Sequence, residues 1–215
     1  MFSILNPDIE KYLHTFSVNN HTEVLRAMER LAAERQFPIV GPSCGKLLLL
    51  LARLMNAKRV FEFGSGFGYS AYWFAEAVGE NGKVVCTDTD EKNKAQAETF
   101  LTEAHLWNRI EYHIGKAQDI FSQSNDTFDI IYNDADKGSY PEIFAMTCKR
   151  LSRGGLYIAD NALWHGNVVA EKVIENKHPG WNEAIKKHNQ MIYDHSDFDV
   201  TLLPLRDGII VARKK

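Results

Sequence analysis

The stretch that decides the fold reads Val60-Phe61-Glu62-Phe63-Gly64-Ser65-Gly66-Phe67-Gly68-Tyr69-Ser70. A short apolar run ends in a carboxylate and three alternating glycines, and the residues that follow, Ser70–Ala75, have a helical pattern. A strand, a glycine turn and a helix in this order bring a ligand close to bare backbone N–H groups. Glycine permits both the positive φ and the close approach that such a turn needs. The alternative is a tight turn that binds nothing.

The glycine spacing argues against a dinucleotide. That fingerprint is Gly-x-Gly-x-x-Gly, whereas here the third glycine, Gly68, comes one residue early. Glu62, just inside the turn, would also place a like charge beside a pyrophosphate. A cationic or zwitterionic ligand fits better, such as the aminoacyl and sulfonium part of S-adenosylmethionine.

The composition is that of a soluble globular protein. The 215 residues are 45% hydrophobic and 25% charged, enough for one α/β domain over residues 1–215. A net charge of -3 gives no electrostatic case for nucleic acid or an anionic membrane. The cysteines Cys44, Cys86 and Cys148 form no C-x-x-C pair and are expected to be reduced core thiols. With no signal peptide or membrane-spanning run evident, we expect a cytoplasmic protein.

The pattern of elements predicts the architecture. Residues 1–57 are expected to form helices, at about Pro7–Thr15, His21–Phe37 and Ser43–Asn56. Residues 58–215 form the sheet core, in which strands alternate with helices. The link around Gly208 permits a hairpin and forbids a parallel crossover. We therefore predict a doubly wound, mostly parallel seven-stranded sheet with a C-terminal antiparallel hairpin. Its strands are Arg59–Phe63, Lys83–Thr87, Arg109–Ile114, Phe128–Tyr132, Leu156–Ala159, Asp199–Leu205 and Ile209–Arg213.

In such a sheet, ligands bind beyond the carboxyl ends of the strands. Asp88 follows the second strand, where a carboxylate meets ribose hydroxyls. The alternative for Asp88 is to cap the next helix, a role that Asp90 could fill as easily. After the third strand, Gly115 and Ala117 could let an adenine ring lie against the backbone, although a plain turn is equally compatible.

The fourth and fifth strands end in oxygen-bearing side chains. Asp134 follows the fourth strand, and Asp160 and Asn161 follow the fifth, its expected neighbour. Two carboxylates and an amide oxygen are ligands that Mg²⁺ prefers. The alternative is that both carboxylates cap helices. His165 is a lone histidine and is expected to be structural or part of a substrate loop.

These stretches resemble the motifs of the cation-dependent O-methyltransferases, a family that includes caffeoyl-CoA and catechol O-methyltransferases and many small bacterial relatives. The resemblance extends from about Ile39 to Arg213. One departure is Asn133, which precedes Asp134 where an apolar or acidic-flanking residue is more usual. The stretches that carry the resemblance are Val60–Ser70, Asp134–Lys137, Asp160–Gly166 and Leu203–Gly208.

The resemblance implies a Rossmann-like class I methyltransferase fold and S-adenosylmethionine as cofactor. Asp88 would take its ribose hydroxyls, Ala117 would line the adenine pocket, and Asp134 would reach its amino group as well as a metal. The methionine end would be held by Val40, Glu62, Gly64 and Ser70.

The resemblance also implies the reacting groups. Asp134, Asp160 and Asn161 would ligate a divalent cation, Mg²⁺ before Mn²⁺ or Ca²⁺, and Lys137 would be the general base. Trp164 and Asp207 would lie near the acceptor. A homodimer is expected, which would suit the N-terminal helices.

The predicted reaction is cation-dependent methyl transfer from S-adenosylmethionine to a hydroxyl of a small catechol-like phenol, such as a caffeoyl-type acceptor. We expect the segment Asn167–Trp181 to cover that acceptor as a surface loop. The alternatives are an NAD-dependent oxidoreductase, a non-catalytic binding protein with a methyltransferase fold, and a metal-independent N-methyltransferase.

Overall fold

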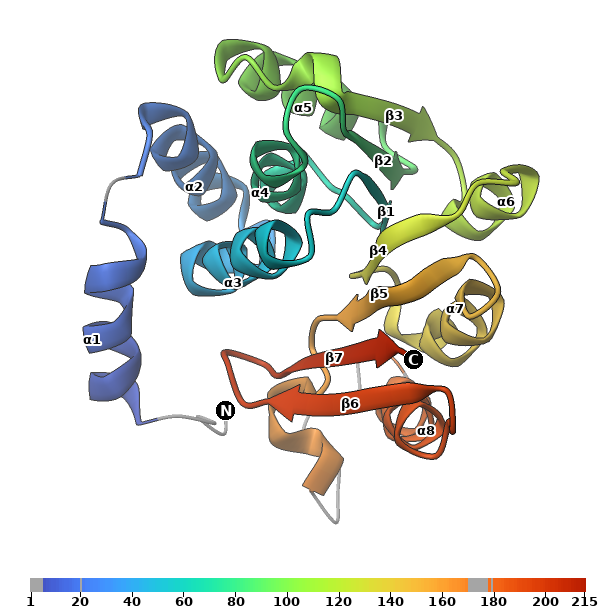
Figure 1. The fold of residues 1–215 in the computed structure, drawn as a ribbon. Coiled ribbons are helices and arrows are strands. Elements are labelled where there is room, and N and C mark those ends of the chain that lie inside the picture. Colours follow the sequence, from blue (N-terminus) through green and yellow to red (C-terminus); the bar gives the residue numbers. More distant parts are fainter. Residues whose placement is uncertain (1–5, 20, 170–177, 179) are drawn as a thin grey trace. The chain divides into compact units, whose positions relative to one another are not determined.

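A computed structural model describes residues 6–19, 21–169, 178 and 180–215 (Figure 1). The chain divides into two compact units, residues 8–124 and residues 125–215, the latter together with Asn6 and Pro7. The seven strands make a mixed, mostly parallel sheet with a C-terminal antiparallel hairpin, which confirms the predicted fold class. Whether the chain behaves as a single domain stays a prediction. Within the described residues, no helix combines the length and the apolar character that spanning a bilayer requires.

The unit of residues 8–124 begins with three helices, as predicted: α1 (Pro7–Ser17), α2 (Glu23–Arg35) and α3 (Gly41–Leu54). Thr22 caps α2, because its side-chain oxygen accepts from the backbone N–H of Leu25. The predicted start of α3 at a Ser43 cap is wrong. The helix begins at Gly41 with Pro42 in its first turn, where the N–H that proline lacks has no partner within the helix.

The same unit holds three parallel strands in the order β3-β2-β1 (Figure 1). The register pairs Phe63 with Thr87 and Asp88 with Ile114, so the three strands end close together at the edge where ligands bind in such sheets. Its elements are β1 (Arg59–Phe63), α4 (Tyr69–Val78), β2 (Lys83–Asp88), α5 (Glu91–Glu103), η1 (Trp107–Arg109), β3 (Ile110–Ile114) and α6 (Ala117–Gln123).

The unit of residues 125–215 holds four strands in the order β4-β5-β7-β6. β4 and β5 are parallel, with Asn133 opposite Ala159, and β7 runs antiparallel to both β5 and β6. The strand ends that carry Asp134 and Asp160 are therefore neighbours, as predicted. The elements are β4 (Phe128–Asn133), η2 (Lys137–Ser139), α7 (Tyr140–Thr147), β5 (Leu151–Ala159), η3 (Trp164–Val169), α8 (Trp181–Tyr193), β6 (Phe198–Leu203) and β7 (Ile209–Lys214).

Two features of this unit differ from the sequence prediction. β5 begins at Leu151 instead of Leu156, because the strand continues through the Gly154-Gly155 pair. Its register against β4 shifts between Phe128 and Ile130, so the strand accommodates the left-handed Gly154 as an irregularity. α8 was not predicted, although its apolar residues Ile185 and Ile192 are fully buried.

Candidate functional site

The glycine turn after β1 has the backbone that its sequence predicts. Gly64, Gly66 and Gly68 have φ angles of +83°, +51° and +89°, which only glycine adopts without strain. The Ser65 N–H donates to the carbonyl of Thr87 at 2.8 Å, and the Gly68 N–H donates to the carbonyl of Ser65 at 2.9 Å. The turn is therefore fastened to the end of β2 before it enters α4.

Asp88 faces this turn and does not cap the following helix. Its Oδ2 accepts from the Gly66 N–H at 3.1 Å, and its Oδ1 accepts from the Asp90 N–H at 2.7 Å. Asp90 is the residue that caps α5, through an N–H···O bond from Lys92 at 2.9 Å. The two carboxylates thus have separate tasks, and the capping alternative for Asp88 is wrong.

The other predicted cofactor residues, except Asp134, lie in the same unit as the turn. Glu62 is fully buried at the end of β1, and its carbonyl accepts from the Thr87 hydroxyl at 2.7 Å. Val40, before α3, and Ser70, in the first turn of α4, are buried, and Ala117 is half-buried at the start of α6. Their contacts with a cofactor stay predictions.

Sequence reasoning missed Tyr112, a buried residue of β3. Its hydroxyl donates to the carbonyl of Gly66. Burial, followed by the charge of Asp88, raises the pKa of Tyr112 well above its usual range, so the phenol stays protonated and can only donate here. A tyrosine within a strand has the pattern of ordinary core, and nothing in the sequence indicates that its hydroxyl supports the turn.

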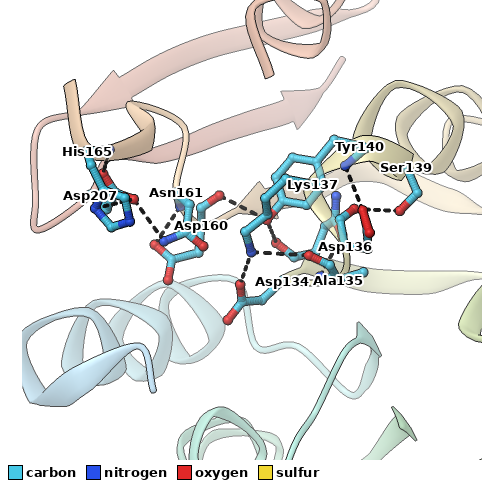
Figure 2. A network of polar contacts seen from close by, with 12 residues as sticks. Asp134, Ala135, Asp136, Lys137, Ser139, Tyr140, Asp160, Asn161, His165 and Asp207 are labelled. Atoms are coloured by element: carbon cyan, nitrogen blue, oxygen red, sulfur yellow. Dashed lines mark hydrogen bonds and ion pairs between the residues drawn. The ribbon is translucent and has the colours of Figure 1, made fainter. Parts of the chain in front are cut away.

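The second cluster follows β4 (Figure 2). Lys137 Nζ lies 2.6 Å from Asp134 Oδ1 and also donates to the carbonyl of Ala135 at 3.2 Å. The Lys137 side chain is largely buried, with its ammonium 5.1 Å from the ring centre of Tyr140. The cap of η2 is Asp136, which accepts from the Gly138 N–H at 2.8 Å. Asp134 is therefore not a cap.

Asp160 stands beside this cluster at the end of β5 (Figure 2). It is 3% exposed, and its Oδ1 accepts from the Asn161 N–H at 2.8 Å. Burial and the charge of Asp134 raise the pKa of Asp160 to about 7, against the opposing charges of Arg206 and Lys137. Because β4 and β5 are parallel neighbours with Asn133 opposite Ala159, Asp134 and Asp160 follow adjacent strand ends. η3 begins only at Trp164, so Asp160 is not a helix cap either.

Asp207 forms hydrogen bonds with the loop that follows Asp160. Its Oδ2 accepts from Asn161 Nδ2 at 3.2 Å and lies 3.4 Å from His165 Nδ1, while its Oδ1 accepts from the His165 N–H (Figure 2). The loop needs such support because Asn161, Trp164 and His165 have left-handed φ angles of 56°, 44° and 53°. Asp207 is buried, so the structure gives it a supporting role; its predicted place near the acceptor stays a prediction.

Trp164, the other predicted acceptor residue, is half-buried with its ring centre 5.5 Å from that of Trp181. Of the segment Asn167–Trp181, residues 170–177 and 179 lie outside the described residues. In the part of the chain that the structure describes, no group of three or more acidic, histidine or cysteine side chains is arranged to hold a metal ion. The three predicted metal ligands include only two carboxylates, together with the amide of Asn161.

Comparison with known proteins gives one consistent result. The family model described as O-methyltransferase matches residues 14–215. A catechol O-methyltransferase from Niastella koreensis is 33% identical over 201 residues, which cover 88% of this chain and 89% of that protein. Caffeoyl-CoA O-methyltransferase 2 from Populus trichocarpa is 28% identical over 212 residues, covering 94% and 86%. The crystal structure of an O-methyltransferase from Bacillus cereus in complex with SAH superposes with a TM-score of 0.85, at 26% identity over 97% of each chain.

Proposed function

Because the chain belongs to the O-methyltransferase family, we propose that it transfers the methyl group of S-adenosylmethionine to a hydroxyl of a small catechol-like phenol with the help of a divalent cation. The SAH-bound Bacillus cereus relative supports the cofactor. The names of the catechol and caffeoyl-CoA relatives support an acceptor with two adjacent hydroxyls.

The cofactor is assigned to the unit of residues 8–124. Asp88 is the proposed ribose ligand and Ala117 the proposed adenine contact. Asp88 is already fixed by the Gly66 and Asp90 N–H groups, so its carboxylate is pre-oriented for a ligand at the turn. The residues proposed for the methionine end are Val40, Glu62, Gly64 and Ser70.

The residues proposed for the cation fit a hard divalent ion. Asp134 and Asp160 are close enough for one charge to raise the pKa of the other group, so the buried pair calls for additional positive charge. Asn161 donates its amide nitrogen to Asp207, which leaves the amide oxygen for a cation. Among the described residues no third acid or histidine joins the set, so the remaining ligand positions would fall to water and the acceptor.

The chemistry requires an acceptor oxygen that is deprotonated near neutral pH, whereas a free phenol has a pKa of about 10. A bound divalent cation would lower the pKa of the acceptor hydroxyl and would bind two adjacent hydroxyls in bidentate fashion. Lys137 is the proposed general base. Its Nζ pairs with Asp134 as an ammonium, so it can take the acceptor's proton only in its neutral form, after it has released its own proton to water.

The juxtaposition of the buried Asp160 with Asp134 is the observation that carries the cation assignment, and Asp160→Ala tests it. We expect this variant to lose metal-dependent methylation of caffeic acid while its affinity for S-adenosylmethionine, measured by calorimetry, stays within about twofold. Asp136→Ala is the control, because Asp136 lies in the neighbouring loop after β4, two residues from Asp134, and its carboxylate caps η2. Full activity of Asp160→Ala in EDTA would refute the cation role.

The same assay separates the alternatives. Family membership leaves no support for the NAD-dependent oxidoreductase. A metal-independent methyltransferase would form product equally in EDTA, and a non-catalytic binding protein would form none with or without Mg²⁺. The homodimer and the cytoplasmic location remain part of the proposal. The exposed apolar side chains of α1, which include Ile9, Tyr12 and Phe16, are consistent with a dimer that size-exclusion chromatography would detect.

A further inference from the structure

We propose that a buried hydrogen-bond relay running from Asn133 through Tyr157 and His188 to Asn189 positions the two loops that carry the proposed cation ligands. The inference rests on the proposed function and deepens it. It assigns to these four side chains the role of positioning residues, which act on the cation through Asp134, Asp160 and Asn161 without touching it.

The relay starts at the loop after β4. The Ala135 N–H donates to Asn133 Oδ1 at 3.3 Å, which fixes the backbone of the residue next to Asp134. Asn133 Nδ2 donates to the Tyr157 hydroxyl at 3.0 Å, across from β4 to β5. The Tyr157 hydroxyl lies 2.9 Å from His188 Nε2, in α8.

The relay ends at the loop after β5. His188 Nδ1 lies 3.2 Å from Asn189 Oδ1, and Asn189 Nδ2 donates to the carbonyl of Ala162 at 2.7 Å. Ala162 follows Asn161 directly. One continuous set of contacts therefore joins the backbone beside Asp134 to the backbone beside Asn161.

The direction of every bond in the relay follows from its two ends. A backbone N–H at Ala135 can only donate, so the Asn133 oxygen faces it and the Asn133 nitrogen donates to Tyr157. A backbone carbonyl at Ala162 can only accept, so the Asn189 nitrogen faces it and the Asn189 oxygen accepts from His188. His188 must then carry its proton on Nδ1 and accept the Tyr157 hydroxyl proton on Nε2.

Burial agrees with this neutral tautomer. Asn133, Tyr157 and His188 are fully buried, and desolvation lowers the pKa of His188 to about 4. Each of the three side chains has its polar atoms engaged by the relay, so the network is satisfied without water. A satisfied buried network holds one geometry, whereas a single broken member leaves its neighbours unpaired.

A second contact acts on the same two loops from α7. The buried hydroxyl of Tyr140 lies 3.1 Å from the carbonyl of Asp160 and 3.4 Å from the carbonyl of Asn133. The loops that carry the proposed ligands are thus braced from α7 and from α8. Partners that orient metal ligands in this way typically change metal affinity or activity by roughly 10–100-fold when removed.

The test is Tyr157→Phe, which removes the central hydroxyl and keeps the ring that packs 5.1 Å from Phe144. Mn²⁺ binding to the full-length protein, followed by electron paramagnetic resonance, should weaken by roughly 10–100-fold. Affinity for S-adenosylhomocysteine should fall much less than affinity for Mn²⁺, because every proposed cofactor residue except Asp134 lies in the other unit. A high Mn²⁺ concentration should recover turnover, as expected for a defect in cation affinity.

Two further variants distinguish a loss of Mn²⁺ affinity caused by misplaced ligands from one caused by lower stability of the protein. The triple variant Asn133→Leu/Tyr157→Phe/His188→Leu replaces the relay by apolar groups. It should be more stable than Tyr157→Phe, because no relay member is left unpaired between them, but its Mn²⁺ affinity should stay as low. Tyr72→Phe removes a buried tyrosine hydroxyl of α4, bonded to Thr22 at 3.1 Å, and should leave Mn²⁺ affinity unchanged.

The outcomes distinguish this inference from the proposed function. Wild-type Mn²⁺ affinity in Tyr157→Phe, or in the triple variant, overturns the relay and leaves the cation assignment standing. Absence of Mn²⁺ binding in the wild-type protein overturns both. An equal loss of affinity for Mn²⁺ and for S-adenosylhomocysteine marks a general folding defect and also overturns the positioning role.

Discussion

Lys137 Nζ and Asp134 Oδ1 form a largely buried ion pair 2.6 Å long, and Asp160 stands beside this pair. Asp160 is influenced by the positive charges of Arg206 and Lys137 and by the negative charge of Asp134. Charges in such a setting are expensive to leave uncompensated, because burial removes the solvation that would stabilise them. This arrangement leads to the first two predictions, on turnover and on the pH dependence of stability.

Lys137→Ala should lower kcat by roughly 100-fold or more and change the KM of the acceptor far less, because a general base acts in the transition state. Lys137→Arg is the matched control, since arginine keeps the positive charge but does not release its proton. Both variants are assayed at saturating Mg²⁺. An unchanged kcat in Lys137→Ala removes Lys137 as the base, and full recovery in Lys137→Arg shows that only the charge matters.

The stability of the metal-free protein should depend on pH through Asp160. Its pKa is raised to about 7 in the folded state, above its ordinary value of 3.8, so folding favours the protonated form. The contribution of Asp160 to stability is therefore fully present below pH 3.8 and is lost as the pH rises through 7. At about 1.4 kcal/mol per pH unit, the loss is roughly 4 kcal/mol in the free energy of unfolding.

Urea unfolding in EDTA at pH 5 and pH 8 compares the wild-type protein with Asp160→Asn, which does not titrate. This interval covers about two of the pH units, so the expected loss in the wild-type protein is roughly 3 kcal/mol. His188 has a lowered pKa, so its contribution is present above pH 6.5 and is lost as the pH falls toward 4, equally in both proteins. Mg²⁺ should stabilise the wild-type protein more at pH 8 than at pH 5, since the cation needs the ionised carboxylate. Identical pH profiles for the two proteins would contradict the prediction.

Substitutions of Asp88 and of Asp90 should have different effects: the first should lower cofactor affinity and the second should lower the stability of α5. Asp88→Ala removes the acceptor of the Gly66 N–H and the proposed ribose ligand, so affinity for S-adenosylhomocysteine should fall by roughly 10-fold or more. Asp90→Ala removes only the α5 cap and should cost about 1 kcal/mol of stability at unchanged affinity. Calorimetry and thermal unfolding give the two readouts. Equal affinities in the two variants would exclude Asp88 from the ribose site.

Gly68, in the glycine turn, can be compared with Gly180, which has the same backbone conformation without close neighbours. Their φ angles are +89° and +90°, but a Cβ at Gly68 would lie 3.1 Å from the Ala97 Cβ and 3.2 Å from Leu101, whereas one at Gly180 would meet nothing within 4 Å. Gly180→Ala should therefore cost only backbone strain, about 1 kcal/mol, and Gly68→Ala about 1–3 kcal/mol more. Urea unfolding compares them, and equal losses would show that the packing of α5 against the turn is loose.

The fold could be predicted largely because its signals are local. Arg59–Phe63 is a strand with the predicted bounds, since it is a short apolar run that ends at a glycine. The start of β5 was missed because Gly154-Gly155 has the sequence pattern of a breaker, and only pairing with β4 shows that the strand continues. α8 follows a segment, Asn167–Trp181, whose composition is typical of a surface loop, and the signal that indicates the helix is the apolar spacing of Ile185 and Ile192.

The neighbourhood of the proposed cation ligands could be predicted, but the contacts around them could not. The ends of β4 and β5 brought Asp134 and Asp160 together as expected, because strand order fixes that neighbourhood. The bond between Asn133 and Tyr157 could not be foreseen, since it joins buried side chains 24 residues apart. Asp207 was expected near the acceptor, whereas its neighbours in the structure, Asn161 and His165, are set by the β6–β7 connection.

The left-handed run after β5 limits how this enzyme can be redesigned for other acceptors. Asn161, Trp164 and His165 hold φ angles that β-branched residues adopt only at high cost, so libraries randomised there will lose Val, Ile and Thr variants through misfolding before their selectivity is ever measured. Asn167–Val169, which carry no positive φ, are the better positions at which to vary this part of the chain.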